Sequence, residues 1–246
     1  MTFVEALTAA ILALLMREDP RIAREPERQA KWLASVSQLT PLHAEVGARG
    51  LLVSPQVDAL LTSSVNYAET RFRLPAPSGD CYQTHPYRNV PSLRWPRGYV
   101  PKMRWVCPSI GPMNVAQNNR FVVHTWPEVV TLIPGLSTER LTVEQMKNPK
   151  TNIQLGYGIL AHWKSACPNK KAPAAPASWL TAYRWGRCTP QHHNKRYFDP
   201  EARKRCERVN FMIEHMKANT ELSIPSGWSC LPKSVRSAVD PMRSPT

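Results

Sequence analysis

Glu69 has the clearest potential for acid–base chemistry in this sequence. It stands in the stretch SSVNYAETRF, residues 63–72, at the end of an apolar-periodic segment. A carboxylate in the last turn of a helix gains nothing from the helix dipole, which favours cations at that end. A solvated glutamate would account for it without any function. If apolar and aromatic side chains surround it instead, their low polarity favours a protonated carboxyl that can act as a general acid.

The cysteines form a second set with possible chemistry. They are Cys81, Cys107, Cys167, Cys188, Cys206 and Cys230. An even count suits a disulfide framework, with fifteen possible pairings. We expect at least one disulfide and favour Cys81–Cys107, which would pin one proline-rich stretch. Cys188 lies close to His192 and His193, as in some zinc sites, but no C-x-x-C pair is present. We therefore expect no metal and no cofactor.

The chain is strongly basic, with a formal net charge of +14 over 246 residues. Such a charge favours polyanions: nucleic acid, anionic lipid or an anionic cell-wall polymer. The basic residues are scattered or form short clusters such as Arg203-Lys204-Arg205, for which a solvated helix face is the simplest interpretation. Because we find no nucleic-acid recognition motif, we expect no nucleic-acid partner.

Apolar residues recur at helical spacing along most of the chain, which predicts a mainly α protein. A hydrophobic content of 42% is sufficient for a folded core. The predicted helices cover residues 3–17, 25–50, 54–72, 138–148, 148–167, 178–188 and 199–222. In the helix over 54–72, Ser54 is the predicted N-cap and Pro55 the first helical residue. Glu69 lies one step from the apolar stripe of this helix.

The other segments divide the chain around these helices. Residues 73–110 are rich in proline and aromatic side chains and predict a long irregular insertion, which in a compact domain is usually functional or disordered. We place an N-terminal helical extension at 1–49 and the main domain at 50–220. A poorly ordered C-terminal tail follows at 221–246, tethered by Cys230.

The N-terminal segment FVEALTAAILALLM is apolar but too short to span a bilayer. No lysine or arginine precedes it, so it does not fit a secretory signal peptide. We expect a first helix that is buried or packs on a partner protein. No other segment is suited to crossing a membrane, and we expect no membrane span.

Four fragments occur in order along the chain: YAETRF, SIGPMNVAQ, NPKTNIQLGYGIL and LTAYRWG. Together they resemble the motifs of the SLT-type lytic transglycosylases, which share the lysozyme-like fold with goose-type lysozymes. The family pattern is Glu-Ser-x-Phe, G-x-M-G-L-M-Q, N-I-x-x-G-x-x-x-L and A-Y-N-x-G. The matching positions are Glu69, Phe72, Gly111, Met113, Gln117, Asn152, Ile153, Gly156, Leu160, Ala182, Tyr183 and Gly186.

The resemblance implies a lysozyme-like fold and cleavage of peptidoglycan between N-acetylmuramic acid and N-acetylglucosamine. Glu69 matches the single catalytic carboxylate of the family, which acts first as acid and then as base. The sugar's own 6-hydroxyl then attacks C1 and gives a 1,6-anhydro product. No second carboxylate is needed, unlike in most glycosidases.

The resemblance also implies substrate-binding roles for other positions. Tyr183 would place its hydroxyl near Glu69, and Gln117 would hydrogen-bond the glycan. Thr70 replaces the family's serine and keeps a hydroxyl, and the turn with Met113 would shape the cleft floor. Arg184 stands where the family has asparagine and could suit an anionic glycan or peptide stem. Core packing alone is the simpler interpretation of Met113. A buried core tyrosine explains Tyr183 as well as a site residue does.

Three further interpretations remain open. Asn152 could simply cap its helix, because asparagine is a good N-cap. A true lysozyme would need a second carboxylate, for which Asp80 is the nearest candidate. A structural or wall-binding role in a larger assembly is the third. The missing signal and the apolar first helix favour a protein that a virion or a secretion apparatus carries to the periplasm or cell wall.

Overall fold

Helices dominate the computed structural model, as the sequence predicts. It describes residues 1–75, 82–84, 104–106, 109–116, 128–136, 141–167, 176–185 and 200–231. The helices are α1 (Phe3–Glu18), α2 (Arg21–Arg24), α3 (Pro26–Gly47), α4 (Pro55–Thr70), α6 (Val143–Lys147), α7 (Pro149–Ala166), α8 (Pro176–Trp185) and α9 (Pro200–Lys217). A further helical turn covers 128–132.

Short strands occur where the sequence analysis expects irregular structure. Strands β1 (Tyr82–Thr84) and β2 (Arg104–Val106) form one antiparallel pair. Strands β3 (Ser109–Ile110) and β4 (Val115–Ala116) form another around the turn at 111–114. The proline-rich stretch therefore contains a strand pair that its lack of periodicity did not indicate. The rest of this stretch, including Cys81 and Cys107, lies outside the described residues.

The cap of α4 differs from the prediction. Ser54 occupies the N-cap position, but its hydroxyl makes no capping bond. The carboxylate of Asp58 instead accepts hydrogen bonds from the backbone N–H groups of Leu52, Val53 and Ser54 at 2.8, 2.7 and 3.2 Å. Asp58 also accepts a bond of 2.6 Å from the Tyr157 hydroxyl of α7. A side chain within the first turn of α4, supported by Tyr157 of α7, thus takes the place of the N-cap side chain.

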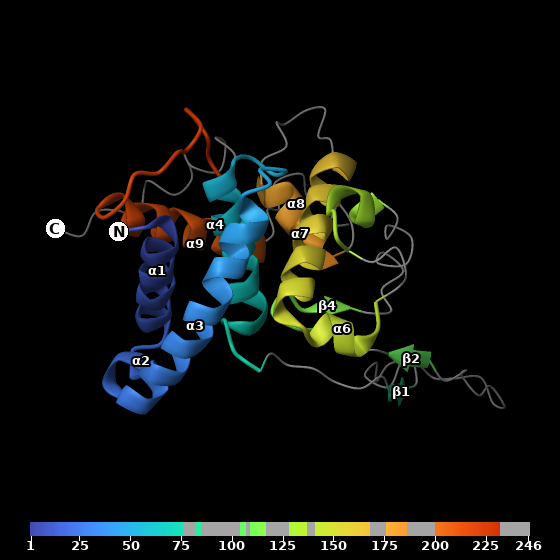
Figure 1. The fold of residues 1–246 in the computed structure, drawn as a ribbon, viewed down its shortest axis with the longest axis horizontal. Coiled ribbons are helices and arrows are strands. Elements are labelled where there is room, and N and C mark those ends of the chain that lie inside the picture. Colours follow the sequence, from blue (N-terminus) through green and yellow to red (C-terminus); the bar gives the residue numbers. More distant parts are fainter. Residues whose placement is uncertain are drawn as a thin grey trace.

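Helix α4 lies at the centre of the core and packs against α3, α7 and α9 (Figure 1). Nearly all its side chains are buried, as expected of a helix that is surrounded on all sides. Helix α1 packs on α3 and α9, and its residues Leu7, Ile11 and Leu14 are fully buried. Residues 1–49 therefore share one core with the rest, and the predicted division at residue 49 coincides with no break in packing.

A disulfide joins Cys206 of α9 to Cys230. It confirms the expectation of at least one disulfide and the predicted tether of the C-terminal segment. Cys167 is disulfide-bonded as well. Within the part of the chain that the structure describes, no helix is long and apolar enough to cross a membrane.

Candidate functional site

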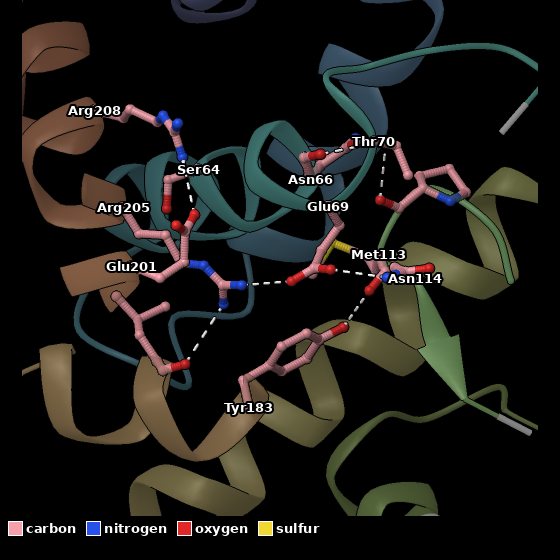
Figure 2. A network of polar contacts seen from close by, with 12 residues as sticks. Ser64, Asn66, Glu69, Thr70, Met113, Asn114, Tyr183, Glu201, Arg205 and Arg208 are labelled. Atoms are coloured by element: carbon pink, nitrogen blue, oxygen red, sulfur yellow. Dashed lines mark hydrogen bonds and ion pairs between the residues drawn. The ribbon is translucent and has the colours of Figure 1, made fainter. Parts of the chain in front are cut away.

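Glu69 lies in the last turn of α4, and its side chain is 17% exposed. One carboxylate oxygen accepts a hydrogen bond from the guanidinium of Arg205 on α9. The other accepts a bond of 2.8 Å from the side-chain amide of Asn114 (Figure 2). Two segments distant in sequence thus hold the carboxylate from opposite sides. A cationic and an amide donor thus contact the carboxylate, whereas most of the aromatic stretch that we expect beside it lies outside the described residues.

Arg205 forms a buried charge pair with Glu69. Its side chain is only 2% exposed, and it also donates a long hydrogen bond of 3.5 Å to the carbonyl of Leu180 on α8. Its guanidinium carbon lies 6.0 Å from the centre of the Tyr183 ring. The guanidinium and the carboxylate carry opposite charges and attract each other at hydrogen-bond distance. The pair explains why a carboxylate can stand at a helix C-terminus, where the dipole alone would disfavour it.

The neighbouring arginine on α9 has its own partners. Arg208 contacts Glu18 at 3.1 Å and Glu201 at 3.6 Å, and its guanidinium lies 4.6 Å from the centre of the Tyr67 ring. The cation that pairs with Glu69 is thus Arg205. Figure 2 shows the two arginines directed to different groups.

The turn at 111–114 positions Asn114 against Glu69. Gly111 has a φ of +74° and Asn114 a φ of +52°, both in the left-handed region. A methyl group added at Gly111 would lie 2.7 Å from the side-chain oxygen of Asn152. It would lie 2.4 Å from the amide nitrogen and from the amide carbon of the same side chain. Glycine is therefore required at 111 both by its backbone conformation and by the close approach of α7.

Asn152 fixes this turn rather than capping its helix. Its amide donates to the carbonyls of Ile110 at 2.8 Å and Met146 at 3.1 Å, and its oxygen accepts from the N–H of Met113 at 2.7 Å. The N-cap of α7 is Asn148, whose side chain accepts from the N–H of Thr151 at 3.1 Å. The alternative of Asn152 as the N-cap is thus wrong, because α7 begins earlier, at Pro149.

Met113 and Tyr183 complete the support of the turn. The Met113 side chain is fully buried, and a methyl group added at Gly156 of α7 would lie 2.6 Å from it. The Tyr183 hydroxyl donates a hydrogen bond of 2.7 Å to the carbonyl of Met113. Burial raises the pKa of Tyr183, and the negative charge of Glu69 adds to this effect. The hydroxyl therefore stays protonated, and it is directed to the turn and not to Glu69.

Thr70 links α4 to the same turn from behind. It is only 5% exposed, and its hydroxyl lies 2.8 Å from the Asn66 side-chain oxygen and 3.3 Å from the carbonyl of Pro112. The Asn66 amide nitrogen lies 2.8 Å from Nε2 of His43, which is fully buried. Burial lowers the pKa of His43 to about 3, so the ring is neutral. A line of polar contacts thus runs from α3 through α4 to the turn.

The structure brings Glu69, Met113 and Tyr183 together, with Thr70 behind them. Neither Thr70 nor Met113 presents its side chain to solvent in this conformation, so both position the site rather than line it. Gln117 lies outside the described residues, as does the side chain of Arg184 on α8.

Neither Asn114 nor Arg205 stands out as a site residue in the sequence. Asn114 belongs to the GPMNVAQ fragment, and an asparagine two residues after a proline favours a turn. Arg205 lies in a basic cluster that looks like a solvated surface. Its burial depends on the packing of α9 against α4 and α8, which no local pattern indicates.

Comparisons of the chain with protein-family models, with curated proteins and with solved structures found no match. A functional interpretation therefore rests on the motif fragments and on the geometry around Glu69.

Proposed function

We propose that this chain is a peptidoglycan lytic transglycosylase with a lysozyme-like fold and with Glu69 as its catalytic acid and base. The observation that carries the proposal is the meeting of the four motif fragments around one carboxylate. Gly111 fits against Asn152, Gly156 fits against Met113, and Tyr183 bonds the carbonyl of Met113. Contacts between fragments thus account for the glycine at two of these positions and for the tyrosine at a third.

The proposed reaction uses Glu69 twice. The protonated carboxyl donates its proton to the glycosidic oxygen as the bond between that oxygen and C1 of N-acetylmuramic acid breaks. The resulting carboxylate then takes the proton of the sugar's 6-hydroxyl as O6 bonds to C1. The products are a 1,6-anhydro sugar and a free hydroxyl on the leaving sugar. No water is consumed, and Glu69 ends in its starting state.

The two partners of Glu69 serve different steps of this reaction. Arg205 can donate to the carboxylate that is left after the acid step and so hold it for the base step. The amide of Asn114 can donate to a carboxylate or to the carbonyl oxygen of a carboxylic acid, so it can hold Glu69 in both states.

A hydrolytic lysozyme is the alternative within the same fold, and its candidate second carboxylate, Asp80, lies outside the described residues. A structural or wall-binding role is the alternative from another class. We also propose that a virion or a secretion apparatus delivers the protein to the periplasm or cell wall. Because α1 is packed into the core, a partner would have to contact the outer faces of the N-terminal helices. The net charge of +14 would concentrate the protein on an anionic wall.

The test is digestion of purified peptidoglycan followed by mass spectrometry of the products. We expect anhydro-muramyl ends from the wild type and from Glu144→Gln, a control that removes an exposed carboxylate paired only with surface lysine. We expect no cleavage by Glu69→Gln. Reducing ends in place of anhydro ends would establish the lysozyme alternative. Equal cleavage by Glu69→Gln would overturn the assignment of Glu69.

A further inference from the structure

A cationic pocket of about 290 Å³ lies between α3 and the chain that leaves α4. Its lining residues are Arg28, Lys31, Trp32, Ser35, Arg73, Leu74 and Pro75. The first four belong to α3, and the last three follow the end of α4. We call this the α3–Arg73 pocket. Its walls combine three cationic side chains with an apolar surface from Trp32, Leu74 and Pro75, and none of the described residues that line it is acidic.

The charges of this pocket are only partly neutralised by the protein. Arg28 contacts Asp19 and Glu25, each at 3.5 Å. Among the described residues, no carboxylate lies within 4.0 Å of Lys31 or Arg73. Like charges brought together without counter-charges repel each other. Lys31 and Arg73 both line the pocket, so an anion bound there could contact both cations.

Arg73 is held at the pocket by the same chain reversal that ends α4. Arg71 and Phe72 both have positive φ, 53° and 57°, and the N–H of Arg73 donates a hydrogen bond of 3.2 Å to the carbonyl of Thr70. Phe72 is fully buried and anchors the reversal. The guanidinium carbon of Arg73 lies 5.9 Å from the centre of the Trp32 ring, which favours a cation over its face. The side chain is thus placed by the fold.

We propose that the α3–Arg73 pocket binds a small organic anion, a carboxylate or phosphate carried on a body the size of one sugar. The volume is at the lower end of small-molecule pockets and accommodates one group of a larger polymer. Lys31 and Arg73 would contact the anionic group, and Trp32, Leu74 and Pro75 would contact its apolar body. The inference does not depend on the proposed function, because none of these residues touches Glu69.

Calorimetric titration of the full chain at low salt tests this proposal. The probes are N-acetylmuramic acid, N-acetylglucosamine 6-phosphate and neutral N-acetylglucosamine, so that the carboxylate and the phosphate are compared on similar sugars. We expect the two anionic sugars to bind and the neutral sugar not to bind. Raising the salt concentration should weaken the binding. Tighter binding of the carboxylate would indicate a peptidoglycan group, and tighter binding of the phosphate a phosphorylated wall polymer.

Variants locate the binding. Lys31→Gln and Arg73→Gln should each reduce the affinity several-fold, and the double variant more than tenfold, because each removes one charged contact. Lys204→Gln, on an exposed position of α9, controls for the general positive charge. Equal binding of the neutral sugar, no binding of either anion, or an equal loss in Lys204→Gln would overturn the proposal. Because binding is measured directly, an inactive enzyme would leave this test unaffected.

Discussion

The carboxylate of Glu69 and the guanidinium of Arg205 form an ion pair between α4 and α9, and the arginine side chain is only 2% exposed to solvent. The two residues are separated by 136 positions in the sequence. The pair therefore joins the proposed catalytic residue to the last helix of the core. Any change at Glu69 also changes the environment of a buried cation.

The first prediction concerns the stability of Glu69→Gln. From the sequence alone this variant is expected to fold as the wild type does. The structure indicates a cost, because the substitution leaves Arg205 buried without its counter-charge. We expect the free energy of unfolding to fall by on the order of 3 kcal/mol, the usual result of removing one partner of a buried pair. Urea unfolding of the purified variant measures this change.

The double variant Glu69→Gln with Arg205→Gln is the matched control for this prediction. Removing both charges should restore part of the lost stability while cleavage stays absent, because the acid and base group is still missing. If Glu69→Gln alone is as stable as the wild type, the ion pair contributes nothing to folding. That result would contradict a stabilising role for Arg205 as the buried partner of Glu69.

The second prediction distinguishes the contribution of the Asn114 side-chain amide from that of the backbone conformation at this position. Asn114→Gly and Asn114→Ala both remove the hydrogen bond to Glu69, and only alanine is strained at the φ of +52°. We expect cleavage of peptidoglycan to fall by roughly a hundredfold in both variants, as for other preorganised donors in active sites. The alanine variant should be less stable than the glycine variant by about 1 kcal/mol. Full activity of Asn114→Gly would show that the amide is not needed.

The positions of the helices can be predicted from the sequence because they depend on local signals. The apolar stripe of α4 and the proline after its cap are both visible within one segment, and they correctly place Glu69 in the last turn. The fragment pattern also indicated that Met113 and Tyr183 belong near Glu69, because each is part of an ordered motif. These predictions needed no knowledge of how distant segments pack.

The partners of Glu69 depended on tertiary packing and could not be predicted in the same way. Arg205 lies in a basic cluster of the kind that is usually exposed to solvent. Its burial depends on the contact between α9 and α4. Asn152 had a plausible local role as an N-cap, but its three hydrogen bonds to distant backbone groups decide its position. Side chains that act between elements are thus the part of the site that sequence patterns miss.

The third prediction tests whether the close approach of α7 fixes the turn at 111–114. Gly111→Ala adds a methyl group at a positive φ and against Asn152, whereas Gly135→Ala adds one at a φ of +92° with no atom within 4 Å. The control should lose about 1–2 kcal/mol of stability from backbone strain alone. Gly111→Ala should lose more and should also lose cleavage activity, because the turn carries Asn114. Equal effects on stability and activity would show that contact with Asn152 is unimportant.

The fourth prediction is a loss of stability in acid caused by His43. Burial lowers its pKa to about 3 in the folded chain, against the ordinary value of 6.5. Between these values the unfolded chain binds a proton that the folded chain does not. The free energy of unfolding should therefore fall as the pH drops below about 6.5, by up to about 1.4 kcal/mol per pH unit.

His43→Gln isolates this effect, because glutamine can still hydrogen-bond the Asn66 amide but cannot take up a proton in this range. Urea unfolding of both proteins should be compared between about pH 6.5 and about pH 5, above the range in which ordinary carboxyl groups titrate. The wild type should lose stability over this interval and the variant should lose much less. Since Asn66 also contacts Thr70 behind the turn at 111–114, the same substitution tests whether this line of contacts supports the proposed activity at neutral pH. An equal loss in both proteins would assign the acid sensitivity to groups other than His43.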